Sequence, residues 1–261
     1  MKRREFLLTT GVVGVSSLAG TAMAGQEGEQ QYLELRKITT LLGNKKKILN
    51  NFLRDVEIPA LNRLGISPVG VFTVKFGPND PTLYMLLPHK SLESVATEST
   101  RLLADSQFLQ DGAEFLDTPI SDPNYVRIET MLLKAFEKMP QVHVPDAVKG
   151  KSSRIFEMRT YESHSRKAAK KKIEMFNKGG EMQIFREAGL HPVFFGETLI
   201  GPKMPNLTYM LAFENMKERD KNWSAFSKHP DWKALKAKAE YKDTVSNITD
   251  IILRPASFSQ V

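Results

Sequence analysis

Short segments of alternating apolar and polar residues recur along the chain, and longer amphipathic segments separate them. Residues 32–38, "YLELRKI", and residues 156–161, "FEMRTY", alternate almost strictly, which is typical of β-strands. In the segment that follows the first of these, apolar residues recur every fourth position at Ile48, Phe52 and Val56, which predicts an amphipathic helix. A hairpin, a second helical region and a final strand follow in each half of the chain.

The second half of the chain repeats the first in the same order. The shift between matching positions is 123 to 125 and falls to 120 near the ends. The matched segments are 34–36 with 157–159, 64–69 with 188–193, 77–78 with 201–202, 84–86 with 209–211, and 128–133 with 248–253. Matches in one order over a whole half-chain indicate an internal duplication.

Each copy predicts the order β-α-β-β-α-β, which is the ferredoxin-like unit. Helices cover only one face of such a sheet, so the other face needs a partner. We therefore predict an α+β fold in which two ferredoxin-like units in tandem pack sheet to sheet as a pseudo-dimeric α+β barrel. The predicted units span residues 30–138 and 154–258, and residues 139–153 form the linker. Gly65 and Gly189 are predicted to end a helix in the left-handed conformation.

Residues 1–24 are predicted to be an export signal. Three basic residues at positions 2–4 precede an apolar stretch, and small residues at Ala22 and Ala24 form an A-x-A-like cleavage site. The apolar stretch is too short for a good membrane-spanning helix. Its beginning, "RREFL", resembles the twin-arginine signal, and an ordinary Sec signal is the alternative. We expect an exported protein, periplasmic or extracellular.

The composition excludes some classes of function. The chain has 37 Lys and Arg, 30 Asp and Glu, a formal net charge of +7 and no Cys. Without Cys it can have no disulfide, no lipoprotein anchor and no catalytic thiol. Much of the basic excess lies in Asn44–Lys47 and Arg166–Lys172, which we interpret as solvated helix faces. Peripheral contact with an anionic membrane or cell-wall surface is the alternative, and no nucleic acid partner is expected.

The polar faces of the two opening strands carry the candidate ligand-binding residues. Glu34 and Arg36 share one face of the first strand, and Glu157, Arg159 and Tyr161 share one face of the second. We expect the apolar faces to meet the helices, so that these five side chains point into the space between the sheets. They form buried ion pairs there, or the Arg residues grip an anionic oxygen while a Tyr donates and a Glu acts as base. The first strand lacks a counterpart of Tyr161, which favours the second half as the active one.

Histidine and aromatic residues give weaker signals. The five His contain no pair at metal-ligand spacing, so no metal site is predicted. His191 and His229 each precede a Pro and are interpreted as structural. No cofactor is predicted, although haem would need only one axial His. Trp223, Phe226 and Trp232 are predicted to form an aromatic cluster in the core. The sequence contains no nucleotide-binding, nucleophile-elbow or zinc-protease motif.

Several segments of the second half together resemble the NIPSNAP domain. They are "FEMRTYES", "AGLHPVFFGETLIGP", "LTYMLAFENMKERD", "FSKHPDW" and "IILRPASF". The first half resembles the same domain as a more diverged copy, so the resemblance covers residues 32–258. It implies the dimeric α+β barrel fold, whose members also include cofactor-free monooxygenases, haem-degrading enzymes, chlorite dismutases and dye-decolorising peroxidases. For NIPSNAP proteins themselves, it implies a role through partner binding.

Two functional hypotheses remain open. The first is an exported NIPSNAP-type barrel, monomeric or homodimeric, that binds a small anionic ligand or a protein partner. The alternative is an oxygenase- or isomerase-like enzyme, cofactor-free or haem-dependent, that uses the pocket between the sheets. Fold analogy does not choose between them. A cavity between the sheets lined by the polar residues would favour the enzyme, and a barrel filled by side chains would count against it.

Overall fold

The computed structural model describes residues 29–77 and 81–261. The predicted export signal, residues 1–24, and part of the first Gly-Pro turn lie outside the described residues. In the part of the chain that is described, no helix combines the length and the apolar character needed to cross a bilayer.

The first unit follows the predicted order of strands and helices. Its elements are β1 (Tyr32–Thr40), α1 (Asn44–Phe52), η1 (Leu53–Glu57), α2 (Ile58–Arg63), β2 (Gly70–Phe76), β3 (Thr82–His89), α3 (Leu92–Leu103), α4 (Ser106–Leu116) and β4 (Tyr125–Ala135). The segment η1 is a single π-helical turn between α1 and α2, a feature that often marks a functional site. Gly65 follows α2 with φ of 81°, which confirms the predicted left-handed residue.

The second unit repeats this order. Its elements are β5 (Ile155–Glu162), α5 (Arg166–Asn177), α6 (Glu181–Glu187), β6 (His191–Ile200), β7 (Asn206–Phe213), α7 (Met216–Lys228), α8 (Pro230–Ala237), η3 (Ala239–Tyr241) and β8 (Asn247–Pro255). Gly180 has φ of 93° and separates α5 from α6, at the place where the first unit has its π turn. Gly189 follows α6 with φ of 79°, as predicted.

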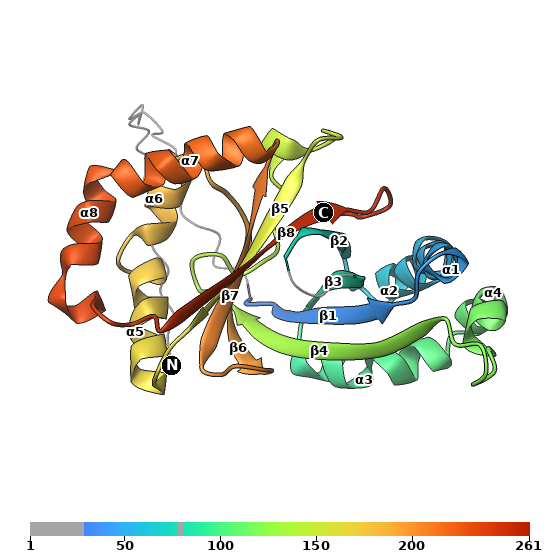
Figure 1. The fold of residues 1–261 in the computed structure, drawn as a ribbon. Coiled ribbons are helices and arrows are strands. Elements are labelled where there is room, and N and C mark those ends of the chain that lie inside the picture. Colours follow the sequence, from blue (N-terminus) through green and yellow to red (C-terminus); the bar gives the residue numbers. More distant parts are fainter. Residues whose placement is uncertain (1–28, 78–80) are drawn as a thin grey trace, which may run out of the picture.

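The eight strands close into one antiparallel barrel in the order β1-β3-β2-β8-β5-β7-β6-β4. Two seams join the units, because β2 pairs with β8 and β4 pairs with β6. The helices α1–α4 lie on one side of the barrel, and α5–α8 lie on the opposite side (Figure 1). The predicted α+β class and the pseudo-dimeric barrel of two ferredoxin-like units are therefore confirmed.

Apolar side chains from all eight strands fill the barrel interior. One residue from each strand illustrates this core: Leu33, Leu86, Phe72, Leu253, Phe156, Met210, Phe194 and Leu133. Each of these eight side chains is fully buried. The rings of Phe72 and Phe156 meet across the two units with 4.9 Å between their centroids. The interior is therefore a packed core in which the two sheets shield each other from water.

The prediction that the polar strand faces point into the barrel is wrong. Arg36 of β1 contacts Glu57 of η1 and Glu98 of α3, and Arg159 of β5 lies against the Trp223 ring of α7. Both polar faces therefore lie beneath the helices. The physical reason is that apolar side chains fill the interior of the closed barrel, whereas the helices bring charged partners to the outer face of the sheet. Buried charges need such partners.

The register of β3 and β7 corrects one match in the repeat. Arg36 pairs with Met85 across β1 and β3, and Arg159 pairs with Tyr209 across β5 and β7. Met85 is therefore the counterpart of Tyr209, and the shift at this strand is 124 positions. Because side chains alternate along a strand, this difference of one residue places Tyr84 in the barrel interior and Tyr209 beneath the helices.

The segment between β4 and β5 is fixed to the barrel. It contains the 3-10 turn η2 (Asp146–Val148). The backbone N–H of Val142 donates to Gln31 Oε1 at 2.8 Å, and the N–H of His143 donates to the carbonyl of Val193 at 2.9 Å. The predicted linker, residues 139–153, thus packs against strands and loops of both units.

Candidate functional site

Glu157 on β5 is the centre of a buried ion-pair network in the second unit. Its side chain has no exposed surface. Oε1 accepts hydrogen bonds from Arg159 Nη1 at 3.0 Å and Arg219 Nη2 at 2.6 Å. Oε2 accepts from Arg219 Nε at 3.1 Å and Trp223 Nε1 at 2.6 Å. Arg219 and Trp223 lie four positions apart on one face of α7. Four donors satisfy both carboxylate oxygens, so the centre of this network is closed.

Aromatic side chains fill the space around this network. The Tyr209 hydroxyl donates to the Tyr161 hydroxyl at 2.8 Å, and burial raises the pKa of both phenols above their ordinary value. The Phe226 ring packs 5.6 Å from Trp223 and 4.5 Å from Trp232, measured between centroids. The predicted aromatic cluster is therefore confirmed as part of the core.

A second buried ion pair in the second unit joins α5 and α6. Lys172 Nζ of α5 is 2.6 Å from Glu181 Oε2 of α6, and both side chains are at most 5% exposed. The Lys172 ammonium also lies 4.5 Å from the centroid of Phe176. Lys172 is thus an exception to the solvated helix face predicted for Arg166–Lys172. Its charge is retained in the core because Glu181 pairs with it.

In the first unit, Arg36 on β1 is surrounded by three carboxylates. Its Nε donates to Glu34 Oε1 at 2.7 Å, and its Nη2 donates to Glu34 Oε2 at 3.0 Å and Glu98 Oε2 at 2.7 Å. Its Nη1 donates to Glu57 Oε1 at 3.3 Å. All four side chains are 7–15% exposed. Glu98 Oε1 is buried without a hydrogen-bond partner. One positive charge faces three carboxylates, so the network carries excess negative charge and one of its acceptor oxygens has no donor.

The carboxylates of the first unit differ widely in proton affinity. Burial alone would raise the pKa of Glu34, but the contact with His89 and the ion pair with Arg36 lower it to about 2. Burial raises the pKa of Glu57 to about 7, because the attraction of Arg36 is opposed by the charges of Glu98 and Glu34. A carboxyl group with a pKa near 7 both gains and loses a proton readily at neutral pH, which is the property required of a general acid or base.

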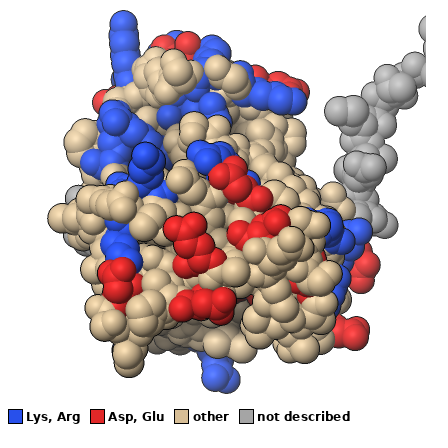
Figure 2. Space-filling model, turned by 90° about the vertical axis from the view of Figure 1, so that its right-hand side faces the viewer, with Lys and Arg blue, Asp and Glu red and all other residues tan. Residues whose placement is uncertain are grey.

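A pocket of about 300 Å³ opens onto this network beneath the first unit's helices, and we call it the first-unit pocket. Arg36, Glu57 and Glu98 line its polar end. Apolar side chains form the rest of its wall: Ile38, Leu49, Phe52, Leu102, Leu103, Phe108, Phe115, Leu116, Tyr125 and Ile128. Several wall residues are partly exposed and form an apolar rim. On the side of the molecule that carries the first unit's helices, acidic side chains gather near the middle (Figure 2).

One pair of equivalent residues explains why the first unit keeps a pocket. The helices α3 and α7 begin at equivalent N-caps, Ser91 and Asn215, whose side chains each accept a backbone N–H three residues further on. Eight residues after these caps stand Ser99 in the first unit and Trp223 in the second. Ser99 lines the first-unit pocket. Trp223 instead occupies the corresponding space and donates to Glu157.

The structure brings the five predicted ligand-binding residues together in two groups. Glu34 and Arg36 form one group in the first unit, and Glu157, Arg159 and Tyr161 form the other in the second. Sequence analysis missed the partners that helices supply, because strand alternation does not show which helical residue faces a strand. One signal was available for the first unit. The 124-position shift of the helices aligns the acid at position 57 with the acid at position 181, both within an apolar helical stripe.

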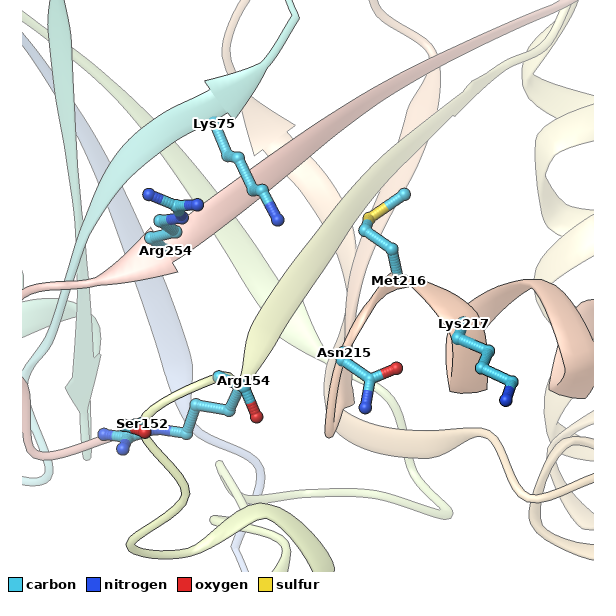
Figure 3. Close-up of a pocket in the computed structure, with 8 residues that line it drawn as sticks. Lys75, Ser152, Arg154, Asn215, Met216, Lys217 and Arg254 are labelled. Carbon is cyan, nitrogen blue, oxygen red and sulfur yellow. The ribbon is translucent and has the colours of Figure 1, made fainter.

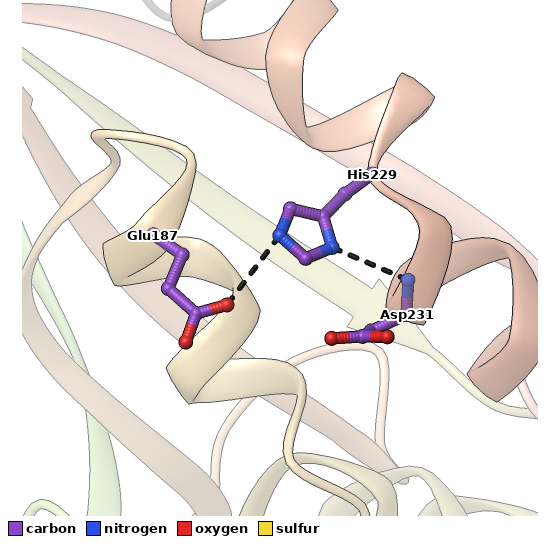
Figure 4. Close-up of side chains that lie close together, drawn as sticks. All are labelled: Glu187, His229 and Asp231. Carbon is purple, nitrogen blue, oxygen red and sulfur yellow. Dashed lines mark hydrogen bonds and ion pairs between the residues drawn. The ribbon is translucent and has the colours of Figure 1, made fainter.

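The histidines act as structural residues or lie away from this site. All five lie in the described part of the chain and none lines the first-unit pocket, which therefore offers no imidazole to a haem iron. His89 is fully buried, with Nε2 3.3 Å from Glu34 Oε2. His229 caps α8: its Nδ1 accepts from the backbone N–H of Asp231 at 3.3 Å, and its Nε2 lies 3.4 Å from Glu187 Oε2 (Figure 4). His229 thus lies at the start of α8, where the sequence placed it, and the ligand atoms of Glu187, His229 and Asp231 lie within 4.8 Å of one another.

Comparison with known proteins gives a family match for the second unit and a shared fold for most of the chain. Residues 156–260 match the sequence profile of the NIPSNAP family. Two solved structures, each named a "putative monooxygenase", align with 87% of this chain. One is from Lactobacillus acidophilus NCFM (10% identity, TM-score 0.54, 94% of its own chain), and the other is from Fusobacterium nucleatum (9% identity, TM-score 0.56, 92% of its own chain).

A solved NIPSNAP-like domain protein from Burkholderia xenovorans aligns with 41% of this chain and 90% of its own, with 21% identity and a TM-score of 0.38. No curated protein sequence matches the chain. The alignments with the two putative monooxygenases show the fold of the chain and do not specify a reaction.

Proposed function

We propose that the chain is a duplicated NIPSNAP-type barrel whose first unit binds a small molecule beneath its helices. The family match over residues 156–260 and the repeated element order support this assignment. The ligand would have an apolar body of about the size of one ring and a head that donates hydrogen bonds. The observation that carries the proposal is an apolar pocket whose polar end is lined by two carboxylates and a single Arg, with Glu98 Oε1 buried and unpartnered.

The charges of the network select the head of the ligand. A cationic or neutral donor would supply the hydrogen bond that Glu98 lacks and would lower the repulsion between Glu57 and its neighbours. An anionic head would face the carboxylates of Glu57 and Glu98, and the Arg36 N–H groups already donate to both. The proposal therefore differs from the anionic ligand that the sequence suggested for Arg36.

Three small molecules with the same aromatic ring test this selection. Benzylamine, benzyl alcohol and benzoate carry a cationic donor, a neutral donor and an anionic acceptor as their head. At pH 8, where Glu57 is ionised, we expect benzylamine to bind most tightly and benzoate to bind about tenfold or more weakly, measured by isothermal titration calorimetry. Tightest binding of benzoate would show that the pocket prefers anions and would refute the proposal.

A variant that gives the first unit the Trp of the second unit tests where the ligand binds. Ser99→Trp should fill the first-unit pocket as Trp223 fills the second unit, and benzylamine binding should be lost. Ser227→Trp places the same side chain at an exposed position of α7 and serves as the matched control. Equal binding by both variants would place the ligand elsewhere on the molecule.

The pKa of Glu57 favours a second candidate function, an isomerase-like enzyme that moves a proton. The Glu57 carboxylate would take a proton from a carbon atom of the substrate and become neutral, and the electron pair would remain on the substrate as an enolate. Return of the proton to another carbon would complete an isomerisation without any further reactant. This candidate predicts that the protein accelerates deuterium exchange into 2,4-pentanedione in D2O above the protein-free rate, seen by NMR, and that Glu57→Gln removes this acceleration whereas Glu240→Gln keeps it.

We also propose, on the sequence of residues 1–24, that the protein is exported by the twin-arginine route. Replacing Arg3 and Arg4 by Lys should leave the precursor inside the cell, because that route depends on the Arg pair, whereas a Sec signal tolerates Lys. Cell fractionation followed by immunoblotting distinguishes the two. Normal export of the variant would assign the signal to the Sec route.

A further inference from the structure

We infer that the seam between the two units binds phosphate-bearing anions, at a site separate from the first-unit pocket. A pocket of about 580 Å³ lies where β2 of the first unit pairs with β8 of the second, and we call it the seam pocket. Four basic side chains make up its charged lining: Lys75, Arg154, Lys217 and Arg254. Among the described residues, no Asp or Glu lines it.

The four cations come from four different segments. Lys75 and Arg254 extend from the neighbouring strands β2 and β8, and the Lys75 ammonium points into the space between β8 and the start of α7 (Figure 3). Arg154, just before β5, lies on another side of this space beside Ser152, and Lys217 extends at its outer edge. The pocket thus combines residues from both units and from the segment that connects them.

These positive charges lack carboxylate partners. Within the described residues, none of the four has a carboxylate oxygen within ion-pair distance. Lys75 Nζ lies 5.3 Å from the ring centroid of Phe76, and Arg154 Nη1 donates to the carbonyl of Lys151 at 3.3 Å. Like charges held around one pocket repel each other, and a bound anion would remove that repulsion.

The other seam shows that an all-basic lining is not a property of seams in general. The hollow beside the β4–β6 seam, about 330 Å³, is lined by three Lys and three Glu. One pair, Lys170 Nζ and Glu197 Oε2, is 2.8 Å apart. Its charges therefore balance, whereas those of the seam pocket do not.

The start of α7 adds donors to the same pocket. Asn215, its N-cap, and the first two helical residues, Met216 and Lys217, all line the pocket. The backbone N–H groups of the first turn have no partner within the helix, and the helix dipole places partial positive charge there. Basic side chains around a helix N-terminus suit a phosphate group, which carries up to two negative charges and several acceptor oxygens.

Calorimetric titration of the purified protein with inorganic pyrophosphate tests the inference. The seam variant, Lys75→Gln with Arg254→Gln, should weaken pyrophosphate binding about tenfold or more. The matched control, Lys233→Gln with Lys236→Gln, removes the same charge from exposed positions of α8 and should change the affinity less than about twofold. Far-UV circular dichroism checks that both variants fold.

Vesicles distinguish a soluble phosphate compound from a lipid headgroup, which share this chemistry. One set contains phosphatidylcholine alone, and the other also contains phosphatidic acid. Pyrophosphate binding without vesicle binding assigns the site to a soluble ligand, and retention on the phosphatidic acid vesicles that the seam variant loses assigns it to a headgroup. If the seam and control variants bind pyrophosphate and vesicles equally, or if wild-type protein binds neither, the inference is wrong.

Discussion

The two units share one scaffold and place a Glu and an Arg at the same positions of their first strands, yet they treat these residues differently. In the second unit two guanidinium groups and an indole surround one carboxylate. In the first, three carboxylates surround one guanidinium. The difference teaches that the helices, rather than the strands, decide whether this space is a sealed core or a pocket.

The largest difference should appear when the central Glu of each network is removed. Glu157→Ala leaves two partly buried Arg side chains, Arg159 and Arg219, without their shared partner and should lower the free energy of unfolding by about 3 kcal/mol. Glu34→Ala should lower it by only about 1 kcal/mol, because Arg36 keeps Glu57 and Glu98. Urea denaturation followed by circular dichroism measures both. Equal losses would show that the two networks are equivalent.

Removing the Trp223 side chain from the second unit should have the next largest effect on stability. Trp223→Ser creates a cavity and removes one donor from Glu157, so the free energy of unfolding should fall by about 2 kcal/mol. The same variant should create space that binds benzyl alcohol, visible as a second site in the titration. A single binding site in this variant would mean that other side chains close the gap.

A third prediction concerns Glu57 and pH. Its pKa of about 7 in the folded protein exceeds the value of 4.5 expected when it is exposed, so the folded state binds more protons between these pH values. The contribution of Glu57 to the free energy of unfolding therefore falls as the pH rises from 4.5 to 7. Glu57→Gln should remove this fall and be more stable than wild type by about 2 kcal/mol at pH 8, with no gain at pH 4. Thermal and urea unfolding across this range check it, with Glu240→Gln as control.

The smallest expected effect distinguishes the two units at β3 and β7, the strands that pair with β1 and β5. Tyr209→Phe removes the hydrogen bond to Tyr161 and should lower the free energy of unfolding by about 1 kcal/mol. Met85 occupies the equivalent position of the first unit, and Met85→Leu should change stability by a few tenths of a kcal/mol to about 1 kcal/mol through packing alone. A pH-jump measurement of Tyr161 ionisation should also show its pKa rise, because the Tyr209 hydroxyl donates to the Tyr161 oxygen and favours its ionised form.

Much of the fold was predictable because the same sequence patterns occur in both halves of the chain. Element order, the two left-handed glycines and the barrel of two units all follow from patterns that occur twice. The direction of the strand faces was not predictable in the same way. Alternation shows that Glu34 and Arg36 share a face, but it does not show which face meets the helices when both faces are buried.

Only the strand residues of the candidate site were predictable, because strand alternation does not show which helical residues contact them. Arg36 and Arg159 were found because each stands two positions from a Glu on a strand. The contacts of Glu98 with Arg36 and of Trp223 with Glu157 were missed because these partners come from helices more than 60 positions away in sequence. The choice of the second half as the active one also rested on Tyr161. That residue proved to be part of a packed aromatic core, whereas the pocket lies in the first unit.

Closure of the barrel within a single polypeptide has an evolutionary consequence. An assembly of two identical subunits must change both halves whenever one codon changes, so an open binding space and a sealed counterpart cannot coexist in it. Here each half has its own codons. Mutation can strengthen one half as a rigid support while it reshapes the other for recognition, and the strand pairing across the two seams keeps both in one folded body.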